Sequence, residues 1–129
     1  MVHYLTVDDV WRINEAEVGP DLLADFGLLE SAVLRPQQSA GGRDAYPDIH
    51  SKAGALLHSL VNNHPFIDGN KRTAVLAIIV FYNLNGWRFV ADQGDLVDLA
   101  LAVVAGNLGI SAIARQLAVW AEPAELPTE

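Results

Sequence analysis

A stretch of ten residues near the middle of the chain, HPFIDGNKRT from His64 to Thr73, gathers the side chains with the most evident chemistry. His64 can serve as a general base, because its unperturbed pKa of about 6.5 lets it take a proton from a hydroxyl near neutral pH. Asp68 supplies a carboxylate of the kind that holds Mg²⁺ together with phosphate oxygens and water. Lys71 and Arg72 add two positive charges. These residue types predict a polyphosphate site with a proton acceptor beside it.

A helical pattern precedes this stretch. Asp48 is a favourable N-cap, and apolar residues then recur on one helix face, at Ile49, Ala53, Leu56, Leu57, Leu60 and Val61. Pro65 disfavours helical dihedrals at the residue before it, so the helix is expected to end at or just before His64. His64 is therefore predicted to lie at a helix exit.

A second helix is predicted to begin near Gly69 or Asn70, since the run from Thr73 to Leu84 is mostly apolar and contains neither Gly nor Pro. The first amides of such a helix are unpaired donors that attract anions, and Gly69 lacks a Cβ and so lets a ligand approach the backbone closely. Lys71 and Arg72 in its first turn oppose the helix dipole by roughly 0.3–1 kcal/mol each. A bound polyphosphate reverses the sign of that penalty, which favours a phosphate site at this helix end.

Each of these residues also has a purely structural interpretation, with His64 as a C-cap, Asp68 as an N-cap, Asn70 as a turn former and Arg72 as a surface side chain. Taken one at a time, the structural interpretation is the stronger. The combination favours function, because a base, a carboxylate, a glycine suited to close approach and two dipole-opposing cations fall within nine residues of one inter-helix turn.

The segment HPFIDGNKRTA resembles the signature of the Fic/Doc superfamily, approximately HxFx(D/E)(G/A)N(G/K)R, whose members transfer part of a nucleotide to a protein hydroxyl. The resemblance implies a role for each matching position. The base is His64, the metal ligand is Asp68, the anion hole is Gly69, Asn70 and Lys71, the phosphate-gripping residue is Arg72, and the buried anchor of the loop is Phe66. ATP as substrate and Mg²⁺ are the implied cofactors.

Two positions indicate a branch of the family. Lys71 stands where enzymes that attach AMP usually have Gly, and Val75 stands where they have a second Arg. This combination resembles the Doc-like branch, the toxins of toxin–antitoxin pairs, although the Doc motif has Ala where this chain has Gly69. The stretch from Gly27 to Pro36, with its GLLESA and RP residues, is also similar to Doc-like chains.

For the Doc-like branch the resemblance implies an inverted nucleotide, whose γ-phosphoryl group passes to a Ser or Thr hydroxyl of a translation protein. Elongation factor Tu is the implied target, and such a kinase would arrest translation. Two alternatives remain open. One is transfer of AMP or another nucleotidyl group, and the other is an inactive module that binds an antitoxin.

The polar segment from Gln37 to Asp48 contains two glycines and Pro47, which predicts a loop or a loose hairpin. The resemblance identifies it with the family's flap, which lies beside the active site and pairs with the backbone of the target. Candidate docking residues there are Arg43, Asp44, Ala45 and Tyr46, and for the individual side chains a solvated connector is the stronger interpretation.

Regulation is predicted to come from a second protein. Many Fic proteins carry an inhibitory (S/T)xxxE(G/N) helix, but no Ser or Thr of this chain has Glu four residues later. By resemblance, restraint would come from a Phd-like antitoxin whose disordered tail folds as a helix on the toxin near the site.

The composition indicates a single folded domain over residues 1–129, with 51% hydrophobic and 19% charged residues. A net charge of −8 argues against general nucleic-acid binding, and no apolar run reaches the roughly 18 residues of a membrane span. The first residues lack the pattern of a signal peptide, and the absence of Cys fits a cytoplasmic protein.

The expected fold is all-α, a compact bundle of about six helices around a central apolar helix, Ala74 to Tyr82, with a flap loop. The first helix begins with capping-box spacing at Thr6 and ends near Gly19, and a short helix is stopped by Pro36. After Gly86 and a short extended segment, Asp92 or Asp95 opens a helix to about Ala105, Ser111 caps a sixth helix, and Glu122–Glu129 form a frayed tail.

Overall fold

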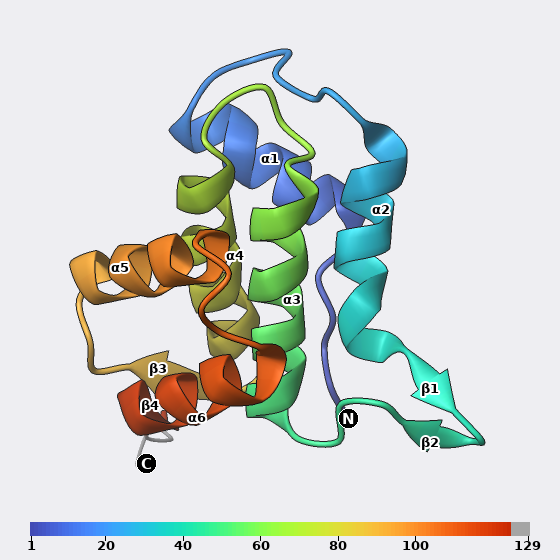
Figure 1. Cartoon of the computed structure of the whole chain (residues 1–129), viewed down its shortest axis with the longest axis vertical. Helices are drawn as coiled ribbons and strands as arrows, with labels where there is room; N and C mark the ends of the chain where they lie inside the picture. Colours follow the sequence, from blue (N-terminus) through green and yellow to red (C-terminus); the bar gives the residue numbers. More distant parts are fainter. Residues whose placement is uncertain (125–129) are drawn as a thin grey trace, which may run out of the picture.

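Six α-helices joined by short connections make up most of the computed structural model, which describes residues 1–124 (Figure 1). The elements in chain order are α1 (Val7–Glu17), α2 (Phe26–Leu34), the 3₁₀ turn η1 (Arg35–Gln37), β1 (Ser39–Ala40), β2 (Arg43–Asp44), α3 (Ile49–Asn63), α4 (Asn70–Leu84), β3 (Trp87–Phe89), α5 (Gln93–Val104), α6 (Ile110–Trp120) and β4 (Ala121–Pro123). The prediction of an all-α bundle of about six helices is confirmed. None of the helices in this part of the chain is long and apolar enough to cross a membrane.

Side-chain caps explain where four of the helices begin. Thr6 and Asp9 form the predicted capping box of α1, and the carboxylates of Asp25, Asp48 and Asp92 accept a backbone N–H at the starts of α2, α3 and α5. Each side chain satisfies one of the donors that a helix start leaves unpaired. The start of α4 has no such cap, and that difference is important for the site.

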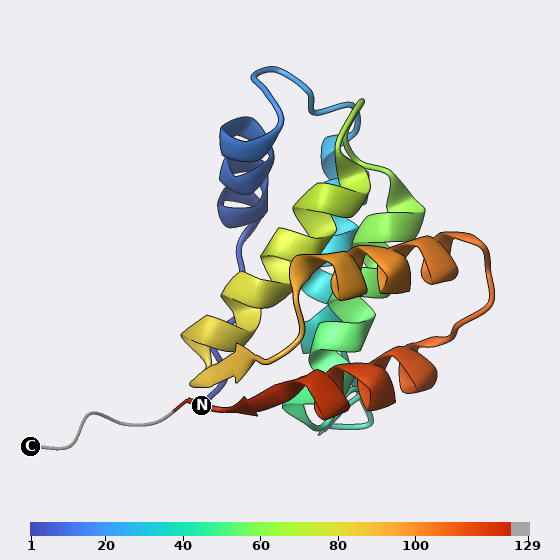
Figure 2. The same ribbon diagram turned by 90° about the vertical axis from the view of Figure 1, so that its left-hand side faces the viewer.

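The centre of the bundle is shared by α3 and α4. Helix α3 packs against α2, α4, α5 and α6, while α4 lies between α1 on one side and α5 on the other (Figure 2). The apolar face of α3 is buried from Ala53 to Val61 and only Ile49 at its start is partly exposed, whereas α4 leaves Leu76, Ile79 and Val80 partly exposed. Helix α4 is therefore central as predicted, but α3 is the more deeply buried of the two.

Three boundaries differ from the prediction. Pro36 does not stop the short helix directly, because it lies in η1, which continues from α2. Ser111 does not cap the last helix, since α6 begins at Ile110 after Gly109 with no side-chain cap. The frayed tail expected from Glu122 is wrong for its first residues, because β4 pairs antiparallel with β3 and Glu122 forms an ion pair with Arg88 at 2.6 Å. The remainder of that expected tail, residues 125–129, lies outside the described residues.

Candidate active site

His64 is the residue at which α3 ends. Its backbone is left-handed, with φ 48° and ψ 56°, a conformation that is uncommon for residues other than Gly but relatively frequent for His. The predicted effect of Pro65 is confirmed, because the helix ends at Asn63. The turn leaves the imidazole exposed at the end of the helix.

Phe66 is buried in the loop between α3 and α4, in the place that the family resemblance implies. Its side chain is 3% exposed, and its backbone lies opposite Leu23 in an isolated antiparallel bridge. Ile67 N donates to Leu22 O at 2.7 Å, and Ala24 N donates to Pro65 O at 2.8 Å. The segment before α2 therefore holds one edge of the loop through its backbone, a role that its sequence does not reveal.

Asn70 holds the other edge of the same loop. Phe66 N donates to Asn70 Oδ1 at 3.0 Å, and Asn70 Nδ2 donates to Phe66 O at 2.7 Å. The same Nδ2 lies 3.2 Å from Nδ1 of His64. This buried amide therefore ties the loop backbone to the imidazole.

A buried amide from α1 supports the site from below, and sequence reasoning did not identify it. Asn14 is 0% exposed, and its Nδ2 donates to Asp68 O at 3.2 Å and to Thr73 Oγ1 at 3.0 Å. It thereby joins the loop to the first turn of α4. The available signal was a polar residue four positions after Val10 on the apolar face of the first helix.

The amino end of α4 is open. Asp68 Oδ1 accepts a hydrogen bond from the N–H of Gly69 at 2.8 Å. This carboxylate therefore bonds to the amide that precedes the helix and does not cap the helix itself. No side chain caps α4, which leaves the amides of its first residues, Asn70 to Arg72, as donors for a ligand. Gly69 has φ 75°, and a Cβ there would lie 2.9 Å from Val18 Cγ1 and closer still to Cγ2. Packing against α1 thus gives a reason for this glycine besides ligand approach.

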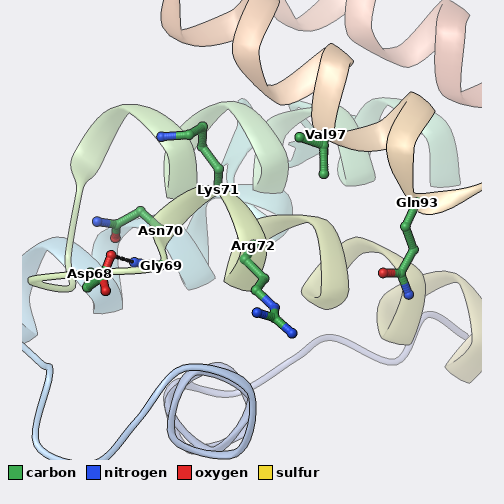
Figure 3. Close-up of a pocket in the computed structure, with 7 residues that line it drawn as sticks. All are labelled: Asp68, Gly69, Asn70, Lys71, Arg72, Gln93 and Val97. Carbon is green, nitrogen blue, oxygen red and sulfur yellow. Dashed lines mark hydrogen bonds between the residues drawn. The ribbon is translucent and has the colours of Figure 1, made fainter.

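A pocket of about 410 Å³ opens at this helix end (Figure 3). Its lining consists of five predicted residues and two from α5 that were not predicted: Asp68, Gly69, Asn70, Lys71, Arg72, Gln93 and Val97. The Lys71 and Arg72 side chains leave α4 in different directions, and Arg72 Nη2 lies 3.6 Å from Glu17 Oε2 of α1. The two cations of the lining are therefore apart, and Arg72 is held toward α1.

The hairpin predicted to be the flap does not lie at this site. Strands β1 and β2 project next to the amino end of α3, whereas His64 is at its carboxyl end, roughly 22 Å away along a helix of this length (Figure 1). Buried Lys52 fixes the hairpin there by pairing with Asp44 at 3.1 Å and donating to Tyr46 O. Arg35 Nε donates to the Tyr46 hydroxyl at 2.8 Å. Placing Arg43, Asp44, Ala45 and Tyr46 beside the active site was wrong, because these contacts hold the segment at the opposite end of α3.

The other histidines lie elsewhere. His50 Nδ1 is 2.8 Å from the Tyr82 hydroxyl, and its ring packs edge-on against Trp87. Burial, with a contribution from Arg35, lowers the pKa of His58. His3 is exposed and hydrogen-bonds to Asn85 through its backbone. Of the four histidines, only His64 contacts a residue that lines the pocket, namely Asn70.

Comparison with known sequences identifies the family. The sequence model of the Fic/DOC family matches residues 4–82, which contain α1, the bridge at Leu23 and the entire loop from His64 to Arg72. The chain belongs to the Fic/Doc family. It is similar to Toxin Doc of Mycolicibacterium smegmatis, with 41% identity over 128 residues that cover 97% of this chain and 98% of the relative. It is also similar to Protein kinase doc of Escherichia phage P1, with 31% identity over 123 residues that cover 90% of this chain and 94% of the relative.

The Fic/Doc motif thus forms one structural unit. Asp68 to Arg72 line the pocket, His64 is joined to it through Asn70, and Phe66 fixes the loop below it. Val75, which stands where AMP-attaching Fic enzymes have a second Arg, is 3% exposed and packs in the core. The pocket therefore has no cation at that position of the Fic/Doc motif.

Proposed function

We propose that this Fic/Doc protein is the toxin of a toxin–antitoxin pair and a protein kinase, which transfers the γ-phosphoryl group of ATP to a Ser or Thr hydroxyl of a translation factor. The observation that carries the proposal is the uncapped amino end of α4, where Lys71 and Arg72 flank free backbone amides beside the His64–Asn70 contact. The names of the two relatives, Toxin Doc and Protein kinase doc, support it. Elongation factor Tu is the acceptor we propose.

Different residues of the chain bind phosphate and accept the proton. The amides of α4 and the Lys71 ammonium group stabilise charge on the transferring phosphoryl group, because fixed dipoles and cations need no reorganisation when that charge develops. Arg72 joins them after exchanging its contact with Glu17 for a phosphate oxygen, an exchange that costs little because both side chains are largely exposed. His64 takes the proton of the acceptor hydroxyl.

The donor set of the site fits a magnesium ion that arrives with the nucleotide. Asp68 is exposed, and only one of its oxygens is used by Gly69 N. Within residues 1–124 no three His, Cys, Asp or Glu side chains cluster as a metal site, so the protein offers one carboxylate and the phosphates would complete the shell. When bound, Mg²⁺ would neutralise phosphate charge, and Asp68 is the residue that would hold it.

Identification of the transferred group tests the proposal. We expect that the chain, incubated with elongation factor Tu and ATP, transfers the label of γ-labelled ATP to the acceptor and adds the mass of one phosphoryl group. Buried Val75 favours this outcome, because the second Arg of AMP-attaching enzymes is missing from the pocket. Transfer of the label from α-labelled ATP, with the mass of AMP, would instead establish nucleotidyl transfer.

A groove between α1 and α4 is the surface we assign to the antitoxin. Ile13, Ala16, Leu76 and Val80 line it with apolar side chains, and its volume is about 260 Å³. Glu17 lines the same groove and contacts Arg72, so the groove is continuous with the phosphate site. A helix from a Phd-like antitoxin would bury its apolar face there and contact Glu17, the residue that holds Arg72.

A bulky residue in this groove is expected to weaken the binding of the antitoxin and to leave the kinase activity in place. Ala16→Trp should weaken antitoxin binding by roughly tenfold or more, because Ala16 is exposed and lines the proposed contact, while acceptor phosphorylation continues. The matched control is Ala118→Trp, which places the same side chain on an exposed position of α6. Calorimetric titration with the antitoxin measures the effect, and equal affinities of the two variants would exclude this groove.

A further inference from the structure

The orientation of the Asn70 side-chain amide is fixed by the loop around it. The peptide N–H of Phe66 can only donate, so the atom it contacts at 3.0 Å is the amide oxygen. The carbonyl of Phe66 can only accept, so the atom at 2.7 Å is the amide nitrogen. Asn70 is 8% exposed, so little water could satisfy the polar groups that a reversed amide would leave unpaired. The N–H and the C=O of Phe66 together therefore determine which end of the Asn70 amide faces His64.

The group that faces the imidazole is consequently an NH₂. It lies 3.2 Å from His64 Nδ1 and has a second N–H left after the bond to Phe66 O. An amide NH₂ donates and does not accept, so Nδ1 must present its lone pair. A neutral imidazole carries one proton, which then resides on Nε2.

We propose that Asn70 holds neutral His64 in the Nε2–H form, so that Nδ1 is the atom that receives the acceptor's proton. The assignment of the tautomer stands on the loop geometry alone, whereas the proton step rests on the proposed kinase function. In that step the O–H bond of the acceptor breaks as an Nδ1–H bond forms, and the oxygen uses the electron pair it keeps to form a bond to the γ-phosphorus of ATP. The bond between that phosphorus and the oxygen that bridges to the β-phosphate breaks, and ADP leaves with its electron pair. The ring becomes an imidazolium that retains its Nε2 proton.

This assignment gives Asn70 a positioning role in addition to phosphate binding. The acceptor hydroxyl must approach on the Asn70 side of the ring and replace the 3.2 Å contact, while the two bonds to Phe66 keep the amide in place. His64 is exposed, so a small rotation of its ring is enough to admit the hydroxyl. The outward-facing Nε2–H meanwhile is a donor and offers no lone pair to a hydroxyl from that side.

Nitrogen-15 NMR of the histidine rings tests the tautomer in the full chain without nucleotide, at a pH where the imidazoles are neutral. We expect the ratio of the Nε2–H to the Nδ1–H form to be roughly fivefold higher at His64 than at exposed His3, which corresponds to one ordinary hydrogen bond. Asn70→Ala should bring the two ratios together. Asn70→Asp, which can only accept, should reverse the preference at His64.

The wild-type comparison decides the matter even if a variant fails to fold. A ratio at His64 equal to or below that at His3 overturns the assignment, and so does an unchanged ratio in folded Asn70→Ala. Because no nucleotide or acceptor is present, a failed kinase assay leaves this result unaffected. A kinase that works with an Nδ1–H histidine would overturn the tautomer and leave the proposed function standing.

Discussion

Replacing His64 by alanine is expected to lower the rate of phosphoryl transfer by a factor of about 10²–10⁴, the range that a general base contributes. The reason is the position of the ring, exposed at the end of α3 and joined through Asn70 to the pocket at the start of α4. The loss should fall on kcat, with little change in nucleotide affinity, because the base acts on the acceptor hydroxyl. Timed phosphorylation of elongation factor Tu measures the rate, and growth arrest in cells reports the same loss.

The controls separate lost chemistry from lost structure. His64→Asn retains a residue type that tolerates the left-handed backbone at this position but has no basic nitrogen, so it should be as inactive as His64→Ala. His3→Ala removes an exposed imidazole elsewhere and should remain active. If the chain with His64→Ala arrested growth as strongly as the intact chain, the protein would be a binding module and not an enzyme.

Local sequence signals predicted most of the elements around the site. Pro65 and the two apolar runs beside it were sufficient to place the loop, since a proline disfavours helical dihedrals at the residue before it through purely local contacts. The starts of α1 and α3 followed from the caps Thr6 and Asp48, and of the two candidates for the start of α5, Asp92 and Asp95, the structure uses Asp92. Caps act over three or four residues, and interactions of that range are visible in one sequence.

Features that depend on distant contacts could not be predicted. The hairpin carries no periodicity, and its place is set by Lys52 and Arg35, which were not recognised as its anchors. Glu122 looked like part of a frayed tail because its pairing with Arg88 joins segments that are far apart in sequence. Nothing in the sequence marks Val97 of α5 as a pocket residue.

The segment before α2 is another element whose role depends on a distant partner. No local pattern marks it, yet Leu22 O accepts from the loop that carries the motif and Ala24 N donates to that loop. In an antiparallel bridge of this type the backbone groups of the middle residue, here Leu23, point away from the partner strand. That free edge lies beside the active site, so it is better placed than the hairpin to pair with an acceptor segment in extended form.

The largest effect on stability is expected at Gly69. Gly69→Ala should lower the free energy of unfolding by about 2–5 kcal/mol, because a left-handed backbone costs an alanine about 1–2 kcal/mol and the new methyl group meets Val18, an overpacking worth about 1–3 kcal/mol. Gly86 provides a matched control, since it has φ 82° and no atom lies within 4 Å of the position that a methyl group would take there. Gly86→Ala should therefore lower the free energy of unfolding only by the cost of the left-handed backbone, about 1–2 kcal/mol.

Removal of the obstructing side chain should reverse the difference. In a chain with Val18→Ala, the further cost of Gly69→Ala is expected to fall most of the way toward that of Gly86→Ala, because both Cγ atoms are gone and only the Cβ of residue 18, at 3.1 Å, still meets the new methyl group. Urea unfolding of the four variants measures the change. Equal costs of the two glycine substitutions in the parent chain would show that Val18 yields freely and that this contact does not fix α1 against α4. The family motif admits Ala at position 69, so the excess cost belongs to Val18 of this chain. Val18 follows Glu17 directly, so the packing of Val18 on Gly69 and the contact of Glu17 with Arg72 at 3.6 Å join α1 to the same turn of α4.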